Sequence, residues 1–408
     1  MRICFVSRRF FPAISGMSIY AINLLRQLVD QGHDVTMISQ YRGDAFGRGV
    51  YGGGRPPHVP GVTVIGLEQL GEQAASEGRP ADFERDIDTI VETICAQHAA
   101  NPFDILHAQY GYPTGWASML AGRRLGLPVV VSIQGGDGHW VGSCCATHRD
   151  AMVRVLDHAS AVLIGGESFA REVHERLGTA MDRFTYVPGA VDTERFTPGT
   201  LGADDAVRIL YHGRVDRRKG VLDFIEACDW LHGNWRATIS GIGPDLAAAE
   251  ALVADKALGD RIVFTGYADY ADVPQIYRAH HIFASPTYAE GFSNTILEAM
   301  ASGLAIVSCH AVGVSDCLRD GENGLLVEPG DIAAQAAALQ GLIDDPAQRQ
   351  RLADAGLAEC RATYSWDVVG KMIADVYAQV AASGAPRPFD TELPVDPDCR
   401  FRAEPHLL

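Results

Sequence analysis

The chain is poor in positive charge. Only three of its 408 residues are lysine (Lys219, Lys256 and Lys371), and lysine and arginine together number 34 against 51 aspartates and glutamates. The net charge is −17, and most of it belongs to residues 201–408, which carry 30 acidic and 17 basic side chains. This acidic balance disfavours nucleic acid as the main partner, and it also disfavours a polybasic membrane anchor.

Long apolar runs are also missing. No run approaches the roughly 20 residues that span a bilayer, so the sequence predicts no transmembrane segment, although peripheral contact with a membrane stays compatible with it. The chain enters the apolar segment 2–7 directly after Met1, without the pattern of a signal peptide. Its nine cysteines have no regular spacing, which in a long chain favours reduced thiols and a cytoplasmic location.

Two short patterns suggest metal ligands, and we expect neither to bind a metal. Cys144 and Cys145 with His148 suggest zinc, but adjacent cysteines are poor tetrahedral ligands and no second pair follows. Asp86 and Asp88 form an Asp-x-Asp pair, but they fall inside a predicted amphipathic helix, where surface charge is the more common reason for such a pair. The sequence therefore predicts buried thiols, a charged helix surface and no metal.

Two nucleotide-binding fingerprints are absent as well. Neither half of the chain contains Gly-x-Gly-x-x-Gly after its first predicted strand, although the chain has 43 glycines, and no Walker-type phosphate loop is found. The first of these absences disfavours a dehydrogenase.

What the chain does contain is a regular alternation of apolar strands and helical segments. Continuous apolar strands separated by helices are typical of a parallel sheet covered on both faces, and 408 residues are too many for one ordinary core. We therefore predict an α/β protein with two doubly wound domains, residues 1–196 and 205–364, and a hinge within the polar segment Thr193–Ala206. The predicted strands are residues 2–7, 34–39, 61–67, 104–109, 128–134, 160–165, 183–189, 207–213, 236–241, 261–266, 281–286, 304–309 and 324–329.

Two segments are expected to lack regular structure. The stretch Arg42 to Pro60 is rich in glycine and proline, which predicts a long mobile loop. Residues 383–408 contain many prolines and charges, which predict an irregular tail.

The segment from Ser285 to Cys309 carries two glutamates, Glu290 and Glu298, with seven residues between them. A polar run at Ser293 opens a predicted helix, and the unpaired N–H groups at a helix start favour a phosphate. Two carboxylates cannot both contact that phosphate without repulsion, but they can accept hydrogen bonds from sugar hydroxyls on either side of it. A glutamate pair near a helix start is more often a solvated surface, yet the flanking apolar strands place this loop at the carboxyl end of a strand, where open α/β sheets bind ligands. The pattern predicts a nucleotide-sugar site.

Basic side chains follow the carboxyl end of another predicted strand, residues 207–213. The predicted strand 207–213 runs into GRVDRRKG, which contains Arg214 and Lys219. An arginine fork and a lysine point charge can together hold a diphosphate, whereas a basic loop in water is the more frequent reason for such a sequence. Because the chain has so few lysines, Lys219 in this loop favours the first interpretation.

The order of several motifs resembles that of the retaining glycosyltransferases of family 4. These motifs are GRVDRRKG, ISGIGP, FTGYADYADVPQIY, EGFSNTILEAMASGLAIV and DGENGLLVEPGD, preceded by FPAISG, LHAQYGYP and VPGAVDTERFTP. The resemblance covers most of residues 1–380. It implies the GT-B fold, in which two Rossmann-like domains face each other across a cleft, with the last helix, 365–382, packing back on the first domain.

The resemblance also implies roles for residues of the second domain. Arg214 and Lys219 correspond to the pair that binds the donor diphosphate, and Glu290 corresponds to the residue that orients the donor hexose, so these three form the implied catalytic group. The resemblance also implies that Gly266 and Tyr267 pass the nucleobase and that Glu298 binds the ribose hydroxyls. The remaining donor contacts lie beside Glu290, where the amides of Gly291, Phe292 and Ser293 are implied near the hexose and Asn294 belongs to the same donor-binding segment.

Three further positions are implied in the first domain. Gly16 corresponds to the loop glycine that lets the backbone approach the diphosphate and acceptor. Asp137 lies in the segment that follows the strand 128–134, and Gln134 stands where the family usually has histidine. Gln134 can hydrogen-bond a sugar hydroxyl but cannot titrate near neutral pH, so the departure argues against proton transfer at this position.

The implied reaction is transfer of a hexose from a nucleoside-diphosphate sugar to a small-molecule, glycan or lipid-linked acceptor, with retention and without metal or cofactor. Two alternatives remain open at this point. A non-catalytic nucleotide-sugar-binding protein of the same fold would fit Gln134, and a nucleotide-sugar epimerase would share the fold but not the EGFSNTILE motif.

Overall fold

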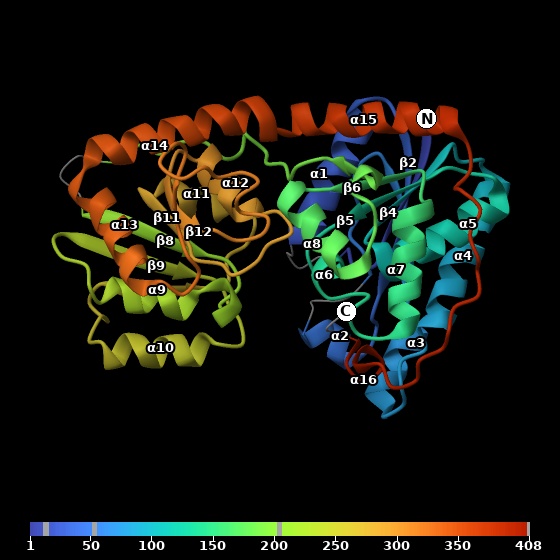
Figure 1. The fold of residues 1–408 in the computed structure, drawn as a ribbon, viewed down its shortest axis with the longest axis horizontal. Coiled ribbons are helices and arrows are strands. Elements are labelled where there is room, and N and C mark those ends of the chain that lie inside the picture. The colour runs from blue at the N-terminus through green and yellow to red at the C-terminus, as the bar shows by residue number, and fades with distance from the viewer. Residues whose placement is uncertain (11–15, 51–54, 202–205, 406–408) are drawn as a thin grey trace. The chain divides into compact units, whose positions relative to one another are not determined.

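The computed structural model describes residues 1–10, 16–50, 55–201 and 206–405. It consists of two compact units, the first formed by Met1–Pro188 with Val369–Leu408 and the second by Gly189–Val368 (Figure 1). The chain therefore leaves the first unit before Gly189 and returns to it after Val368.

The first unit contains a seven-stranded sheet in the order β3-β2-β1-β4-β5-β6-β7, and every described pairing is parallel. Helices lie on both faces of the sheet (Figure 1). The strands are β1 (Arg2–Ser7), β2 (Asp34–Tyr41), β3 (Val62–Glu68), β4 (Ile105–Gln109), β5 (Val129–Ile133), β6 (Ala161–Ile164) and β7 (Phe184–Tyr186). The helices are α1 (Gly16–Asp30), α2 (Ala45–Val50), α3 (Leu70–Gln73), η1 (Ala74–Glu77), α4 (Phe83–Ala100), η2 (Gly111–Gly115), α5 (Trp116–Leu125), α6 (Gly136–His139), α7 (Ala146–His158), α8 (Glu167–Leu177), η3 (Met181–Arg183), α15 (Trp366–Ser383, counted here from Val369) and α16 (Arg400–Ala403).

The second unit repeats the scheme with six parallel strands in the order β10-β9-β8-β11-β12-β13. The strands are β8 (Val207–His212), β9 (Trp235–Ser240), β10 (Ile262–Gly266), β11 (Ile282–Ser285), β12 (Ala305–Cys309) and β13 (Leu325–Val327). The helices are η4 (Arg217–Lys219), α9 (Val221–Cys228), α10 (Leu246–Asp255), α11 (Val273–Arg278), α12 (Asn294–Ala301), α13 (Ile332–Asp344), α14 (Pro346–Glu359) and η5 (Cys360–Tyr364).

The predicted fold class is confirmed: both units are doubly wound α/β sheets, and each strand that the apolar runs predict is present. The runs were readable because most central strands are buried along their whole length, as β4, β5, β11 and β12 are. Such strands carry apolar residues on both faces rather than on alternate positions.

The segment in which the sequence predicts a hinge is counted with the second unit as far as it is described. Phe196, which is 1% exposed, packs in the core of that unit, and the backbone N–H of Val191 donates to the carbonyl of Tyr364. After Val368 the chain returns to the first unit along α15. There Tyr377 of α15 is fully buried and hydrogen-bonds His107 of β4. Buried side chains and hydrogen bonds thus fasten each of these segments within its own unit.

Two expectations for the first unit are wrong in part. The stretch Arg42 to Pro60 contains helix α2, because Asp44 accepts hydrogen bonds from the Arg42 guanidinium and from the backbone N–H of Gly47. Residues 51–54 of this stretch lie outside the described residues, and residues 55–60 form neither helix nor strand. Of the Asp-x-Asp pair, Asp88 is exposed as predicted, but Asp86 is not surface charge. Asp86 is 3% exposed, and its two oxygens accept the N–H groups of Gly71 and Glu72 at 2.8 Å. Its side chain therefore fastens α3 to α4.

The tail after α15 has little regular structure but makes specific contacts with the first unit. Phe389 packs against Trp116 and accepts a hydrogen bond at its carbonyl from Arg123, both on α5. Arg154 of α7 donates to carbonyls of the tail, and α16 follows (Figure 1). Among the helices that the structure describes, none has the length and apolar character needed to cross a membrane.

Candidate nucleotide-sugar site

The loops that follow three neighbouring strands of the second sheet are joined to one another. The backbone N–H of Gly241, after β9, donates to the carbonyl of Gly266, which ends β10. A Cβ on Gly241 would lie 1.8 Å from the carbonyl oxygen of Gly213, so this position needs glycine to let the loop after β8 approach. Arg214 follows Gly213 directly, and the predicted residues Gly266 and Arg214 therefore belong to one connected edge of the sheet.

Lys219 and Glu290 form an ion pair at this edge. The Lys219 Nζ lies 2.7 Å from Glu290 Oε1 and 3.3 Å from the carbonyl oxygen of Ala289. The lysine ends η4, after β8, and the glutamate lies in the loop after β11, and these two strands are neighbours in the sheet. Both side chains remain partly accessible, at 34% and 19%. Both residues were predicted from the sequence, and the structure brings them into contact.

The loop after β8 and the loop after β11 can approach each other closely because a glycine, Gly220, lies between them. Gly220, immediately after Lys219, has a φ of 72° and lies so close to the loop after β11 that a Cβ would be 2.0 Å from the carbonyl oxygen of Pro286. The backbone N–H of Tyr288 donates to the carbonyl of Arg218 across the same gap. The position of Lys219 thus depends on a residue without a side chain.

We expect Gly220→Ala to destabilise the protein more than Gly266→Ala, a matched control. Both glycines have a positive φ (72° and 69°), which disfavours any L-residue by about 1–2 kcal/mol. Only Gly220 also faces a backbone clash, because a Cβ at Gly266 would meet nothing within 4 Å. Thermal or urea unfolding of both variants measures the difference, and equal losses would show that the close approach to Pro286 contributes nothing.

Arg214 is the most exposed of the three residues in the implied catalytic group. Its side chain is 61% accessible, and its Nε lies 3.4 Å from Asp216 Oδ2. Asp216 also accepts hydrogen bonds from Arg218, and these bonds lower the pKa of Asp216 to about 2. Asp216 and Arg218 were not among the predicted site residues, although the sequence GRVDRRKG contains the alternation Arg-x-Asp-x-Arg. Asp216 orients a second arginine in the loop that carries Arg214.

Helix α12 begins beside Glu290. Its N-cap, Ser293, makes no side-chain capping bond to the helix, so the first N–H groups are not satisfied in that way. Gly291 and Ser293 are buried, whereas Phe292 and Asn294 lie against the backbone of Gly189, within 2.6 and 3.0 Å of where its Cβ would be. The predicted residues 290–294 are therefore contiguous at one helix start.

Glu298 lies one turn further along α12 and is 8% exposed. Burial raises the pKa of its carboxyl group to about 7, although a hydrogen bond from the Tyr277 hydroxyl at 3.0 Å and the charge of Arg195 act in the opposite direction. Tyr277 was not predicted, because its link to Glu298 crosses from α11 to α12. Tyr267, in contrast, is 49% exposed beyond the end of β10.

The first unit holds the remaining predicted residues, and these are described within that unit alone. Gly16 begins α1. Gln134 follows β5, and its Oε1 accepts a hydrogen bond at 2.8 Å from Gln109, which in turn accepts one from Ser7. The residue at the position of the expected histidine therefore belongs to a chain of neutral groups across three strand ends. Asp137 lies in α6, and its side chain is outside the described part of the structure.

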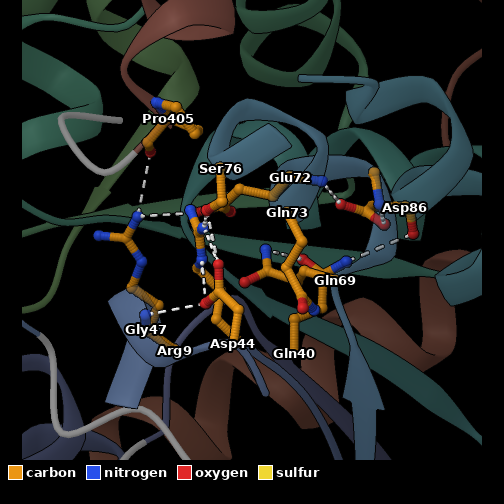
Figure 2. A network of polar contacts seen from close by, with 12 residues as sticks. Arg9, Gln40, Asp44, Gly47, Gln69, Glu72, Gln73, Ser76, Asp86 and Pro405 are labelled. Atoms are coloured by element: carbon orange, nitrogen blue, oxygen red, sulfur yellow. Dashed lines mark hydrogen bonds and ion pairs between the residues drawn. The ribbon is translucent and has the colours of Figure 1, made fainter. Parts of the chain in front are cut away.

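An ionic cluster that was not predicted from the sequence lies beyond the ends of β1 and β2 (Figure 2). Glu72 is fully buried, and the arginines that follow β1 and β2 surround it: Arg8 at 2.9 Å, Arg42 at 3.5 Å and Arg9 at 3.6 Å. Arg8 and Arg9 also donate to the carbonyl of Pro405 in the tail. The arginines are distant from Glu72 in sequence, so no local sequence pattern predicts the cluster.

Two sequence families match the chain. Residues 15–190 match a family described as glycosyl transferase 4-like domain, and residues 206–345 match a family described as glycosyl transferases group 1. Curated relatives include the glycogen synthase of Mycobacterium tuberculosis, 25% identical over 97% of this chain and 98% of the relative. A D-inositol 3-phosphate glycosyltransferase of Catenulispora acidiphila is 26% identical over 89% of this chain and 90% of the relative.

Solved structures share the fold. Sucrose-phosphate synthase from Thermosynechococcus elongatus superposes with a TM-score of 0.74 at 24% identity, covering 94% of this chain and 99% of that one. The Anabaena protein HepE, solved in complex with UDP and glucose, superposes with a TM-score of 0.73 at 17% identity, covering 93% and 100%. At these identities the likeness establishes the arrangement of the backbone.

Proposed function

Since the chain belongs to the GT-B glycosyltransferases of the family 4 kind, we propose that it moves a hexose from a nucleoside-diphosphate sugar to an acceptor hydroxyl with retention of configuration. The observation that carries the proposal is the contact between Lys219 and Glu290 at the carboxyl edge of the second sheet, beside the start of α12. A cation, the amide groups of a helix start and a carboxylate there match the diphosphate and hydroxyls of such a donor.

Each group has a part in the proposed transfer. The bond between the sugar C1 and the phosphate oxygen breaks, and Lys219, Arg214 and the N-terminus of α12 stabilise the charge that develops on the leaving diphosphate. Glu290 accepts hydrogen bonds from hexose hydroxyls and keeps Lys219 in place. The acceptor oxygen bonds to C1 on the face that the phosphate leaves, and its proton passes to the leaving phosphate oxygen.

This route asks for no protein nucleophile and no proton transfer at Gln134, whose amide is engaged with Gln109. It also asks for no metal in the transfer step, because the two cations and the helix terminus act on the same phosphate oxygens. We propose that the acceptor is a small molecule, a glycan or a lipid-linked sugar, and that the enzyme works in the cytoplasm.

A thermal-shift screen of nucleoside diphosphates and their sugars tests the donor class, since a ligand at 100 times its dissociation constant adds about 2.7 kcal/mol of stability. Turnover with candidate acceptors follows for each donor that shifts the transition, and NMR of the product gives its anomeric configuration. A product of inverted configuration would contradict retention. Release of an epimerised free sugar would contradict transfer.

Glu298 predicts a pH dependence of nucleotide binding. The carboxylate is the form that accepts hydrogen bonds from ribose hydroxyls, but burial raises its pKa to about 7, so much of the free protein carries the acid below that pH. Ionisation of Glu298 disfavours the folded protein, because its folded-state pKa lies above the ordinary glutamate value of 4.5. This loss of stability accumulates as pH rises from the ordinary carboxyl pKa to the folded-state pKa of about 7 and is complete above it. We therefore expect the affinity for nucleoside diphosphate to increase as the pH rises from about 6 to about 8. We also expect Glu298 to release a proton when the nucleotide binds.

Isothermal titration calorimetry in buffers of different ionisation enthalpy measures that proton. Glu298→Gln is the control, because the diphosphate itself titrates near pH 6 and its contribution stays the same in both proteins. Equal proton release by the two proteins would remove Glu298 from the nucleotide site.

A further inference from the structure

Three side chains at the start of α7 meet a fourth from the tail, which is distant from them in sequence. Cys144 and Cys145 precede α7, His148 lies in its first turn, and Cys399 stands immediately before α16 in the tail. Their three sulfurs and one ring nitrogen all lie within 4.8 Å of one another. We infer that these residues form a tetrahedral binding site for a thiophilic divalent cation of the zinc class.

The distances fit such a site. Around Zn²⁺, with Zn–S near 2.3 Å and Zn–N near 2.0–2.1 Å, tetrahedral geometry separates two sulfurs by about 3.8 Å and a sulfur from a nitrogen by about 3.6 Å. Cys144 Sγ lies 4.0 Å from Cys145 Sγ, and His148 Nδ1 lies 3.6 Å from Cys399 Sγ and 3.0 Å from Cys144 Sγ. Each of these distances is within about 0.6 Å of the corresponding edge of the tetrahedron.

The surroundings of His148 are a second, independent reason. The residue is fully buried, and its ring lies among Tyr112 at 4.4 Å, Phe83 at 5.6 Å and Phe401 at 6.0 Å between centroids. In the described part of the chain Nε2 has no hydrogen-bond partner, and the contacts of Nδ1 are with sulfurs, which are weak partners. Buried polar groups are normally satisfied, and a metal ion satisfies Nδ1 and three thiols together.

The choice of ligands indicates which metal and which role. Three thiolates and one imidazole, with no carboxylate, favour zinc over magnesium or calcium. Four protein ligands leave no open position for substrate, which is the arrangement of a structural site rather than a catalytic one. A disulfide explains the cluster less well, because one disulfide would leave the third cysteine and the histidine without partners.

The ion would fasten the tail to α7. Hydrogen bonds already flank the cluster, since the Thr147 hydroxyl donates to the carbonyl of Pro394 at 2.6 Å and accepts the N–H of Asp396 at 2.8 Å. Beyond the cluster, Arg402 pairs with Glu84. The site therefore ties residues 394–402 to the start of α7.

Metal analysis of the full-length protein tests the inference. The protein is produced without a histidine tag in zinc-supplemented medium and purified under reducing conditions. We expect about one zinc per chain. After zinc removal and addition of Co²⁺, we expect the intense visible bands of tetrahedral cobalt with a thiolate charge-transfer band. Failure to bind either Zn²⁺ or Co²⁺, or a disulfide among the three cysteines by mass spectrometry of fresh protein, would overturn the assignment.

Matched cysteine variants locate the site. Cys399→Ser is expected to lose nearly all zinc, whereas Cys95→Ser, on a partly exposed cysteine of α4, is expected to keep it. Full zinc content in Cys399→Ser would overturn the four-ligand site.

Limited trypsin digestion covers the case in which Cys399→Ser does not fold, because it uses the wild-type chain. Chelation should speed cleavage after Arg400 and Arg402 of the tail several-fold, and zinc should restore protection. A rate of cleavage in the tail that does not change on chelation would contradict the site.

Discussion

Lys219→Ala is expected to lower the rate of sugar transfer by roughly 10²–10³-fold, the usual effect of removing one preorganised group that stabilises developing charge. The Lys219 Nζ is held by Glu290 and by the carbonyl of Ala289, so its position is set before the donor binds. Charge grows on the leaving diphosphate as the C1–O bond breaks, and the loss should therefore appear mainly in kcat rather than in KM. Steady-state kinetics with a donor identified by thermal shift measures both.

Lys256→Ala is the matched control. Lys256 is also an ion-paired lysine of the second unit, with its Nζ 2.7 Å from Glu226 and 3.1 Å from Asp229, but it belongs to the surface around α9 and α10. We expect its rate to stay within about twofold of wild type, because surface ion pairs contribute little. A Lys219→Ala enzyme as active as Lys256→Ala, with an unchanged unfolding transition, would remove Lys219 from the mechanism.

Glu290→Ala is expected to lower the rate by at least about tenfold, and the double variant separates its two parts. If Glu290 acts only by positioning Lys219, the double variant should be no slower than Lys219→Ala. If Glu290 also holds the hexose, the double variant should be slower than either single variant.

The sequence predicted the fold well because the information was local. A buried parallel strand is an apolar run on both faces, so β4, β5, β11 and β12 stand out from their neighbours without any alignment. The same reasoning failed for Arg42 to Pro60, where glycine and proline suggested a loop. There an aspartate, Asp44, begins helix α2 through side-chain contacts with Arg42 and Gly47.

The candidate site was predictable only in part, for the same reason. Lys219 and Glu290 lie in short loops at the ends of neighbouring strands, so strand order alone places them near each other. The hydroxyl of Tyr277 on Glu298 and the sulfur of Cys399 beside His148 join segments that no period or spacing connects. In the second case nothing in the sequence indicates that Cys399 lies beside the segment of Cys144 and Cys145.

Glu72→Gln is expected to destabilise the protein by about 3–5 kcal/mol, which is the usual cost of removing one partner from a buried ion pair. Glu72 is fully buried, and the arginines around it expose only 3% (Arg8), 13% (Arg9) and 5% (Arg42) of their side chains. Without the carboxylate, these guanidinium groups stay buried beside one another with less opposite charge. Because Arg8 and Arg9 also bind the carbonyl of Pro405, we expect the end of the tail to loosen as well (Figure 2).

Urea unfolding of Glu72→Gln beside Glu77→Gln isolates the effect of burial. Glu77 lies on the adjacent turn and pairs with Arg79, but both side chains are about two-thirds exposed, so its loss should cost at most about 1 kcal/mol. Burial of Glu72 opposes its ionisation, yet the charges of Arg8, Arg9 and Arg42 outweigh burial and lower its pKa. Its stabilising effect is therefore present above the ordinary carboxyl pKa and is lost as pH falls through the lowered one. The gap in stability between wild type and Glu72→Gln should accordingly be full at neutral pH and shrink in strong acid, and a gap that does not change with pH would mean that packing, not charge, holds this cluster.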